Sequence, residues 1–205
     1  MPKQVDPNAQ RLSIANAALK VIGDCGLENA RLRDVARVAG VTTGAVTHYF
    51  DGKDEMLLAA LDELVRRVLE QQTNPPAGMS PGDAVFELAC AILPLDDAGR
   101  KDWRVWMAFW GRAVADARLQ AKHRAYYVRM IGQLAEGLTD TGGLSPARAN
   151  LLADAVTAAV DGIGARATLE PEHWPASRQR ETLAVLLKPL LQSLEKTPVR
   201  PRPET

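Results

Sequence analysis

The sequence predicts an all-α protein of about nine helices, with a three-helix helix-turn-helix domain followed by a larger helical domain. Three observations predict this class. Apolar residues recur at helical spacing along much of the chain. Capping residues and prolines mark helix starts, and glycines mark ends. The 205 residues are 46% hydrophobic and 24% charged, which is ordinary for a globular protein with a real core.

The first helix is expected from about residue 8 to a glycine at 23 or 26. Its apolar stripe comprises Leu12, Ala15, Leu19 and Ile22. A second helix should end at Gly40, where a left-handed backbone is easily adopted. Val41 is expected to fill the angle between two helices, and Thr42 to cap the next one. Residues 31–50 therefore predict helix, short turn, helix.

The third predicted helix carries small or polar side chains on its outer face. Val46 and Phe50 are expected to point inward, and the outward residues are Thr43, Gly44, Thr47 and His48. A helix that needs only solubility more often carries Lys and Glu there. Small hydrogen-bonding side chains suit a helix that approaches base edges in the major groove. The alternative is a two-helix corner of a bundle with solvated Thr and His.

A fourth helix is expected over about residues 53–72, and its apolar residues cover more than one face. Lys53 stands where the N–H groups of this helix converge, a position that suits a phosphate, although a solvated surface lysine is the plain alternative. Tyr49 can offer its hydroxyl to a phosphate or belong to the core. Lys+Arg and Asp+Glu both number 25, so net charge gives no global attraction to nucleic acid.

Five further helices are expected after the loop at residues 74–81. Their starts are marked near Pro81, Asp97 and Pro146, and the last begins near Ser177. The last two helices carry a small-residue face and a long leucine stripe, which predict a four-helix interface between two copies. These helices could also pack only within one chain. Pro189 should kink the last helix, and the tail from about residue 197 should be disordered.

The head resembles the tetracycline-repressor (TetR) family of regulators. The resemblance lies in Val35-Ala-x-x-Ala-Gly-Val-Thr-x-Gly-x-x-x-His-Tyr-Phe-x-x-Lys53 and covers about residues 8–70. The run Trp103-Arg-Val-Trp-Met-Ala-Phe-Trp110, with Asp161-Gly162, is similar to effector domains of the betaine/choline regulator subgroup. The resemblance implies a homodimer that binds a palindromic double-stranded DNA operator, most simply as a repressor. It also implies a ligand cavity in the helical domain and release from DNA on ligand binding.

Carried over by position, the resemblance implies base-edge contacts from Arg33, Thr43, Gly44 and Thr47. It implies phosphate contacts or helix positioning by Thr42, His48, Tyr49 and Lys53. Two positions depart from the family pattern. Arg31-Leu32 stand where a small hydroxyl residue usually caps the second helix. Thr47 stands where the family often has tyrosine, and the shorter side chain suits a methyl group or a phosphate.

An effector site is predicted around the sixth helix. Its aromatic face could be approached from neighbouring helices, and the candidate residues are Phe86, Cys90, Trp103, Met107, Trp110, Tyr127 and Met130. Such a lining suits an apolar or aromatic ligand, and tryptophan faces also attract quaternary ammonium groups. Asp161 can meet a cation or bond within the core. The alternative is that the aromatic stripe is plain core.

The expected domains are 1–53, which binds DNA, and 73–205, which binds the effector and dimerises, connected by the helix over 53–72. No signal region or membrane span is found, so a cytoplasmic protein is expected. The two cysteines suggest buried thiols rather than a disulfide or metal site. No cofactor is indicated. A helical enzyme is disfavoured because the histidines are scattered and no catalytic motif is present. A helical interaction module without DNA binding is the other alternative.

Overall fold

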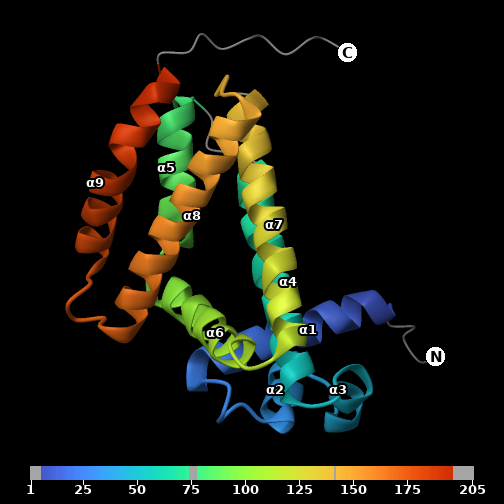
Figure 1. Ribbon diagram of the computed structural model, residues 1–205. Helices are drawn as coiled ribbons and strands as arrows, with labels where there is room; N and C mark the ends of the chain where they lie inside the picture. The colour runs from blue at the N-terminus through green and yellow to red at the C-terminus, as the bar shows by residue number, and fades with distance from the viewer. Residues whose placement is uncertain (1–5, 74–77, 141, 196–205) are drawn as a thin grey trace. The chain divides into compact units, whose positions relative to one another are not determined.

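The computed structural model describes residues 6–73, 78–140 and 142–195, which form nine α-helices (Figure 1). The predicted all-α fold is confirmed. The chain divides into two compact units. The first contains Met1–Arg66 and Arg100–Gln120, and the second contains Arg67–Gly99 and Ala121–Thr205. Within the described ranges, no helix is both long enough and apolar enough to span a bilayer.

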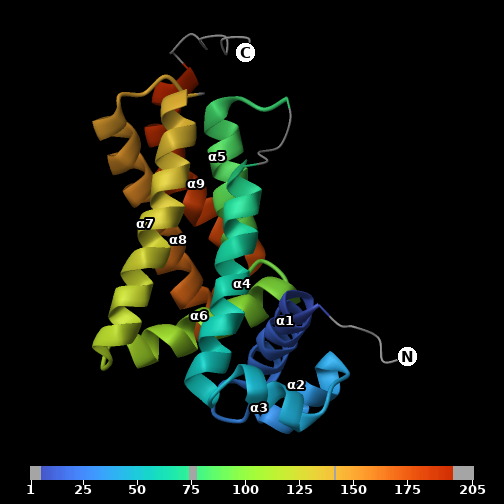
Figure 2. The ribbon, with the colours of Figure 1, turned by 90° about the vertical axis from the view of Figure 1, so that its right-hand side faces the viewer.

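Three helices form the N-terminal part of the first unit and lie together in both ribbon views (Figures 1 and 2). Their bounds are α1 Pro7–Cys25, α2 Leu32–Ala39 and α3 Thr43–Tyr49. Asp6 caps α1 by accepting a hydrogen bond from the backbone N–H of Asn8 at 2.9 Å. The core between the helices is made by buried apolar side chains, including Ile14, Ala18, Ile22, Val35, Val46 and Phe50.

The first unit also contains the start of α4, which spans Lys53–Thr73, and most of α6, which spans Asp97–Ala113. Gly23 on α1 allows α6 to approach closely, because a Cβ at this glycine would lie 2.8 Å from the Cβ of Lys101. Lys101 pairs with Asp24 at 2.9 Å, and Arg104 donates to the Gly23 carbonyl at 2.9 Å. The C-terminal end of α1, where helix carbonyls lack partners, is thus bound by two cations of α6.

The second unit contains α5, the greater part of α7, α8 and α9. Their full bounds are α5 Pro81–Ile92, α7 Ala117–Asp140, α8 Pro146–Leu169 and α9 Ala176–Glu195. Ser80 and Ser145 cap α5 and α8, each followed by proline at the first helical position. α5 packs against α9 and α8, as both ribbon views show (Figures 1 and 2). The core of this unit includes Val85, Ala89, Leu152, Val156, Leu183 and Leu187.

Two details of the sequence prediction are wrong. Leu12, expected in the buried stripe of α1, is 46% exposed, because the core side of this helix begins one turn later. Cys25 is exposed at the end of α1, whereas Cys90 is buried as expected.

Pro189 lies inside α9, which continues past it to Glu195. The predicted disorder from about residue 197 falls outside the described residues.

Candidate nucleic-acid interface

The turn between α2 and α3 is built by a glycine and a threonine. Gly40 ends α2 with φ 69° and ψ 30°, a left-handed conformation that strains residues with a Cβ. The N–H of Val41 then donates to the carbonyl of Ala36 at 3.0 Å. Thr42 caps α3, because its Oγ1 accepts from the N–H of Ala45 at 3.1 Å. The predicted helix, turn and helix are therefore present with the predicted cap.

The start of α2 has no such cap. Arg31 is its N-cap residue, and its side chain makes no capping hydrogen bond. The departure from the family pattern noted at this position therefore has the expected structural consequence. Asp34 lies in the first turn and partly compensates, because a carboxylate there interacts favourably with the helix dipole.

The outward face of α3 is the predicted one. Val46 is fully buried and Phe50 is 2% exposed, while the exposed residues are Thr43, Gly44, Thr47 and His48. A Cβ added at Gly44 would meet only the Thr42 hydroxyl oxygen, at 3.9 Å. The fold therefore does not require glycine here, although glycine weakens a helix by about 1 kcal/mol relative to alanine. Because Gly44 has no side chain, a ligand can approach the backbone of α3 closely at this position.

Two hydroxyl groups on α3 have defined hydrogen-bonding roles. Thr47 Oγ1 donates to the Gly44 carbonyl at 3.0 Å, which leaves the acceptor lone pairs and the methyl group for a ligand. Thr42 Oγ1 already accepts from a backbone N–H, so its proton is available to a phosphate oxygen. Tyr49 is half-buried, and its hydroxyl donates to Gln10 Oε1 of α1 at 3.3 Å. The Tyr49 contact favours a role in positioning α3.

Two cations lie on the helices that precede and follow α3 in the chain. Arg33 is exposed on α2. Lys53 begins α4, and its Nζ donates to the backbone carbonyl of Glu28 in the loop between α1 and α2. The same Nζ lies 3.9 Å from the Glu28 carboxylate, and 38% of the Lys53 side chain is exposed. The ammonium group is thus anchored to the loop, while part of the Lys53 side chain is open to solvent.

The eight predicted effector residues are divided between the two units. Trp103, Met107 and Trp110 lie on α6 in the first unit, where the two tryptophan rings meet edge to face at 5.9 Å. Trp103 is 2% exposed, which agrees with a core residue as well as with a pocket wall. Phe86, Cys90, Tyr127, Met130 and Asp161 lie in the second unit. The prediction that all eight form one site stays a prediction.

A polar contact in the second unit joins two of these residues. The Tyr127 hydroxyl donates to Asp161 Oδ2 at 2.9 Å, linking α7 to α8. Burial raises the pKa of Asp161 to about 6, and the Tyr127 hydrogen bond opposes part of this rise. His123 stacks on Tyr127 with ring centroids 4.2 Å apart, and burial lowers its pKa. A carboxylate held in this environment would gain from a nearby cation.

His123 is one of the three histidines that lie scattered over separate segments of the sequence. It is half-buried within α7, and its spacing of four residues from Tyr127 was the signal in the sequence.

Phe86 faces two cations of α9, since Arg180 and Lys188 each lie 5.8 Å from its ring centroid. Burial raises the pKa of Cys90 to about 11, so its thiol stays protonated and unreactive near neutral pH.

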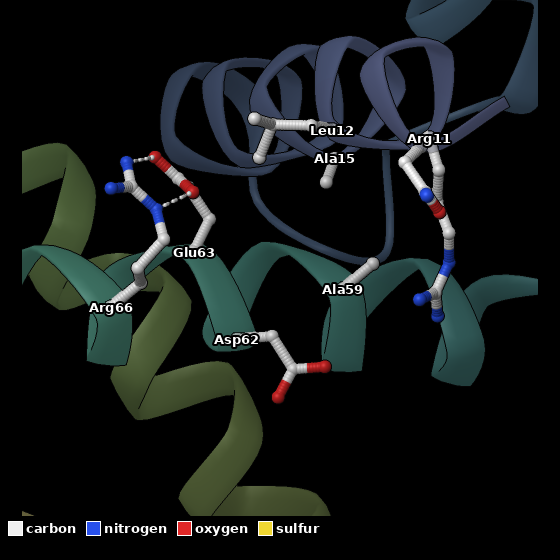
Figure 3. A pocket seen from close by; sticks show the side chains of 8 residues that line it. Arg11, Leu12, Ala15, Ala59, Asp62, Glu63 and Arg66 are labelled. Atoms are coloured by element: carbon white, nitrogen blue, oxygen red, sulfur yellow. Dashed lines mark hydrogen bonds and ion pairs between the residues drawn. The ribbon is translucent and has the colours of Figure 1, made fainter. Parts of the chain in front are cut away.

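Two of the hollows in the described residues contain none of the predicted site residues. Figure 3 shows the first, a groove of about 200 Å³ between α1 and α4, where Leu12 and Ala15 face Ala59. Its wall includes Glu63, which is 4% exposed and paired with Arg66 at 2.7 Å. The second, of about 70 Å³, lies in the second unit. Its lining is mostly apolar and comprises Gln72, Pro81, Ala84, Val85, Leu88, Gln133, Leu134, Gly137 and Leu138.

Two family patterns match the chain. The pattern described as "Bacterial regulatory proteins, tetR family" matches residues 14–60, which include α2 and α3. The pattern described as "BetI-type transcriptional repressor, C-terminal" matches residues 81–192. The first match thus covers the helix-turn-helix, and the second covers most of the chain from α5 to α9.

Individual proteins agree with these patterns. The HTH-type transcriptional regulator BetI of Vibrio atlanticus (strain LGP32) is 31% identical over 184 residues, covering 88% of this chain and 90% of the relative. A transcriptional regulator from Rhodococcus sp. Rha1 superposes with a TM-score of 0.73 at 32% identity, covering 92% of this chain and 99% of that one. A regulator from Saccharomonospora viridis, solved in complex with choline, has a TM-score of 0.70 at 20% identity, covering 96% and 100%.

Proposed function

Because this chain belongs to the TetR family of transcriptional regulators and has a BetI-type C-terminal region, we propose that it represses transcription as an effector-released homodimer on a palindromic operator. It is a DNA-binding regulator rather than an enzyme. The observation that carries the proposal is the outer face of α3. Four exposed, small or polar residues project from a helix whose inward side chain, Val46, is fully buried.

In this proposal α3 enters the major groove. Arg33 and the α3 residues Thr43, Gly44 and Thr47 face base edges, since small hydrogen-bonding groups allow the helix backbone to approach them. Thr42, His48 and Lys53 hold phosphates, and Tyr49 orients α3 through its bond to α1. Phosphate contacts fix the register of the head on DNA, whereas base-edge contacts determine the sequence that it selects.

The test is fluorescence anisotropy with a duplex from upstream of the gene and a scrambled duplex of equal length. Arg33→Ala should weaken binding to the specific duplex more than to the scrambled one. Lys53→Gln should weaken both alike and reduce the salt dependence, because one phosphate contact is lost. Lys122→Gln removes an exposed cation of α7 and is the control. Equal binding of the wild type to both duplexes with no salt dependence would support the interaction-module alternative instead.

The dimer interface is proposed on α8 and α9. Leu151 and Leu169 of α8 are 60% and 70% exposed, and Val185 and Leu186 of α9 are 76% and 48% exposed. Large apolar side chains left open on neighbouring helices are typical of an interface. Val185→Glu should convert the dimer to a monomer in light scattering. Val128→Glu, at a 66% exposed position on α7, is the matched control and should leave the dimer intact.

The effector is proposed to be a small organic cation. The half-buried Asp161 carboxylate supplies a negative charge, and Tyr127, whose hydroxyl donates to that carboxylate, supplies an aromatic ring. Isothermal titration should show binding of choline but not of 3,3-dimethyl-1-butanol, which has the same shape without the charge. Asp161→Asn should weaken choline binding, and equal binding of both compounds would contradict a cation site.

A further inference from the structure

Arg112 of α6 joins three segments of the first unit. Its Nη2 lies 2.9 Å from Glu28 Oε1, in the loop between α1 and α2. Its Nη1 lies 2.9 Å from Asp54 Oδ1, in the first turn of α4. The planar guanidinium can hold both carboxylates at once because its N–H groups point in two fixed directions. Each pair taken alone is partly exposed and would contribute little to stability.

Lys53 shares Glu28 with this arginine. Its Nζ donates to the Glu28 backbone carbonyl, which uses one of the three ammonium protons. The carboxylate of Glu28 stays 3.9 Å away, beyond hydrogen-bonding distance, while its Oε1 accepts from Arg112. The same hydrogen bond is the main reason that the pKa of Glu28 lies below its ordinary value. Two cations thus compete for one carboxylate, and Arg112 has the shorter contact.

We propose that Arg112 and Glu28 are positioning residues for DNA binding, because Arg112 keeps the Glu28 carboxylate from hydrogen-bonding to Lys53 and so leaves the lysine for a DNA phosphate. This inference rests on the proposed phosphate contact of Lys53. Without Arg112, the carboxylate of Glu28 would be free to hydrogen-bond to the ammonium group of Lys53. A phosphate would then have to displace an internal anion before it could bind.

The position of Arg112 is set by the docking of α6. Near the start of the helix, Lys101 pairs with Asp24 at 2.9 Å and Arg104 donates to the Gly23 carbonyl at 2.9 Å. Arg112 lies about two turns beyond Arg104 on the same helix. A shift of α6 along α1 would therefore change the contact between Arg112 and Glu28. The availability of the Lys53 ammonium group to a DNA phosphate would then change as well.

A double-mutant cycle measured by anisotropy on the operator duplex tests the inference. Arg112→Gln should weaken DNA binding by up to about fivefold, which is the upper end of the effect of one exposed charge pair. It should also lower the salt slope, as Lys53→Gln does. Glu28→Gln added to Arg112→Gln should restore both affinity and slope. In a Lys53→Gln background, Arg112→Gln should have no further effect. Arg118→Gln, which removes an exposed cation at the start of α7, is the control of equal charge.

The outcomes separate the inference from the proposed function. If Lys53→Gln weakens binding but Arg112→Gln does not, or if Glu28→Gln fails to rescue it, the positioning role is overturned and the phosphate contact stands. If Lys53→Gln binds DNA like the wild type, both the phosphate contact and the positioning role are overturned. Thermal unfolding confirms that each variant is folded. Should Arg112→Gln unfold, Arg112→Met gives the same test, because methionine fills similar space but has no N–H group to hold the Glu28 carboxylate. Normal affinity together with a normal salt slope in that variant would overturn the inference.

Discussion

At the scale of single residues, the outer face of α3 shows where binding and stability require different side chains. Gly44 lies inside a helix with open space around it, so its conformation does not require glycine. Gly44→Ala should stabilise the protein by about 0.5–1 kcal/mol, because alanine restricts the unfolded chain and favours the helix. It should also weaken operator binding, since in the proposed complex the new methyl group would stand between the α3 backbone and the base edges.

Chemical denaturation and anisotropy on the same sample measure the two effects of Gly44→Ala. Gly132→Ala, at another open helical glycine on α7, should give the stabilisation without the loss of DNA binding. A Gly44→Ala variant that binds the operator as tightly as the wild type would argue against close approach of α3 to DNA.

Asp161 provides a prediction about pH. Its carboxyl has a pKa of about 6 in the folded protein against an ordinary value of 3.8, so the folded state binds more protons than the unfolded chain between these values. Stability should therefore fall as pH rises through this window, by about 2–3 kcal/mol once the carboxyl is fully ionised. Asp161→Asn keeps a hydrogen-bond acceptor for Tyr127 and removes the half-buried charge.

The variant Asp161→Asn should thus be more stable than the wild type at pH 7.5, with a smaller difference at pH 5. Urea unfolding without effector at the two pH values measures this. Both proteins retain His123 beside Tyr127, so titration of the histidine largely cancels in the comparison. A difference that is larger at pH 5 than at pH 7.5 would contradict the raised pKa.

At the scale of elements, the contact between α1 and α6 depends on one missing side chain. A Cβ at Gly23 would lie 2.8 Å from the Lys101 Cβ and 3.1 Å from the Lys101 carbonyl oxygen. Gly23→Val should destabilise the protein by about 1–3 kcal/mol, because α6 must move away. Gly111→Ala on α6, where the added Cβ meets open space, should be neutral or stabilising. Thermal unfolding of both variants measures this, and a Gly23→Val protein as stable as the wild type would contradict the close packing.

At the scale of the whole molecule, the sequence predicted what depends on local signals. Gly40 and the Thr42 cap define the turn between α2 and α3, and their roles follow from backbone geometry alone. The alternation of buried Val46 with exposed neighbours follows from helical periodicity. Contacts between distant segments could not be predicted in this way. Arg112 contacts Glu28 across 84 positions of sequence. In the sequence alone, this residue cannot be told from any other surface arginine.

The same limit applies to the effector residues. The periodicity of α6 correctly places its aromatics on a helix, but a buried aromatic stripe has the same sequence pattern whether it lines a pocket or fills a core. Tyr127 and Asp161 are 34 positions apart, and only the packing of α7 on α8 brings them together. The unpredicted groove between α1 and α4 likewise depends on how two helices pack, so no single segment encodes it.

If a cation releases the protein from DNA, the two ligands must influence each other equally. An effector that lowers operator affinity by some factor must itself bind more weakly to the operator complex by the same factor. The coupling arises only from differential affinity for two states, and values of about 5- to 150-fold are typical. We expect choline to weaken operator binding within this range. Titration of choline into the free protein and into the operator complex should give the matching ratio. Choline that binds both forms equally, while operator affinity stays unchanged, would show that this cation is a ligand without being the effector.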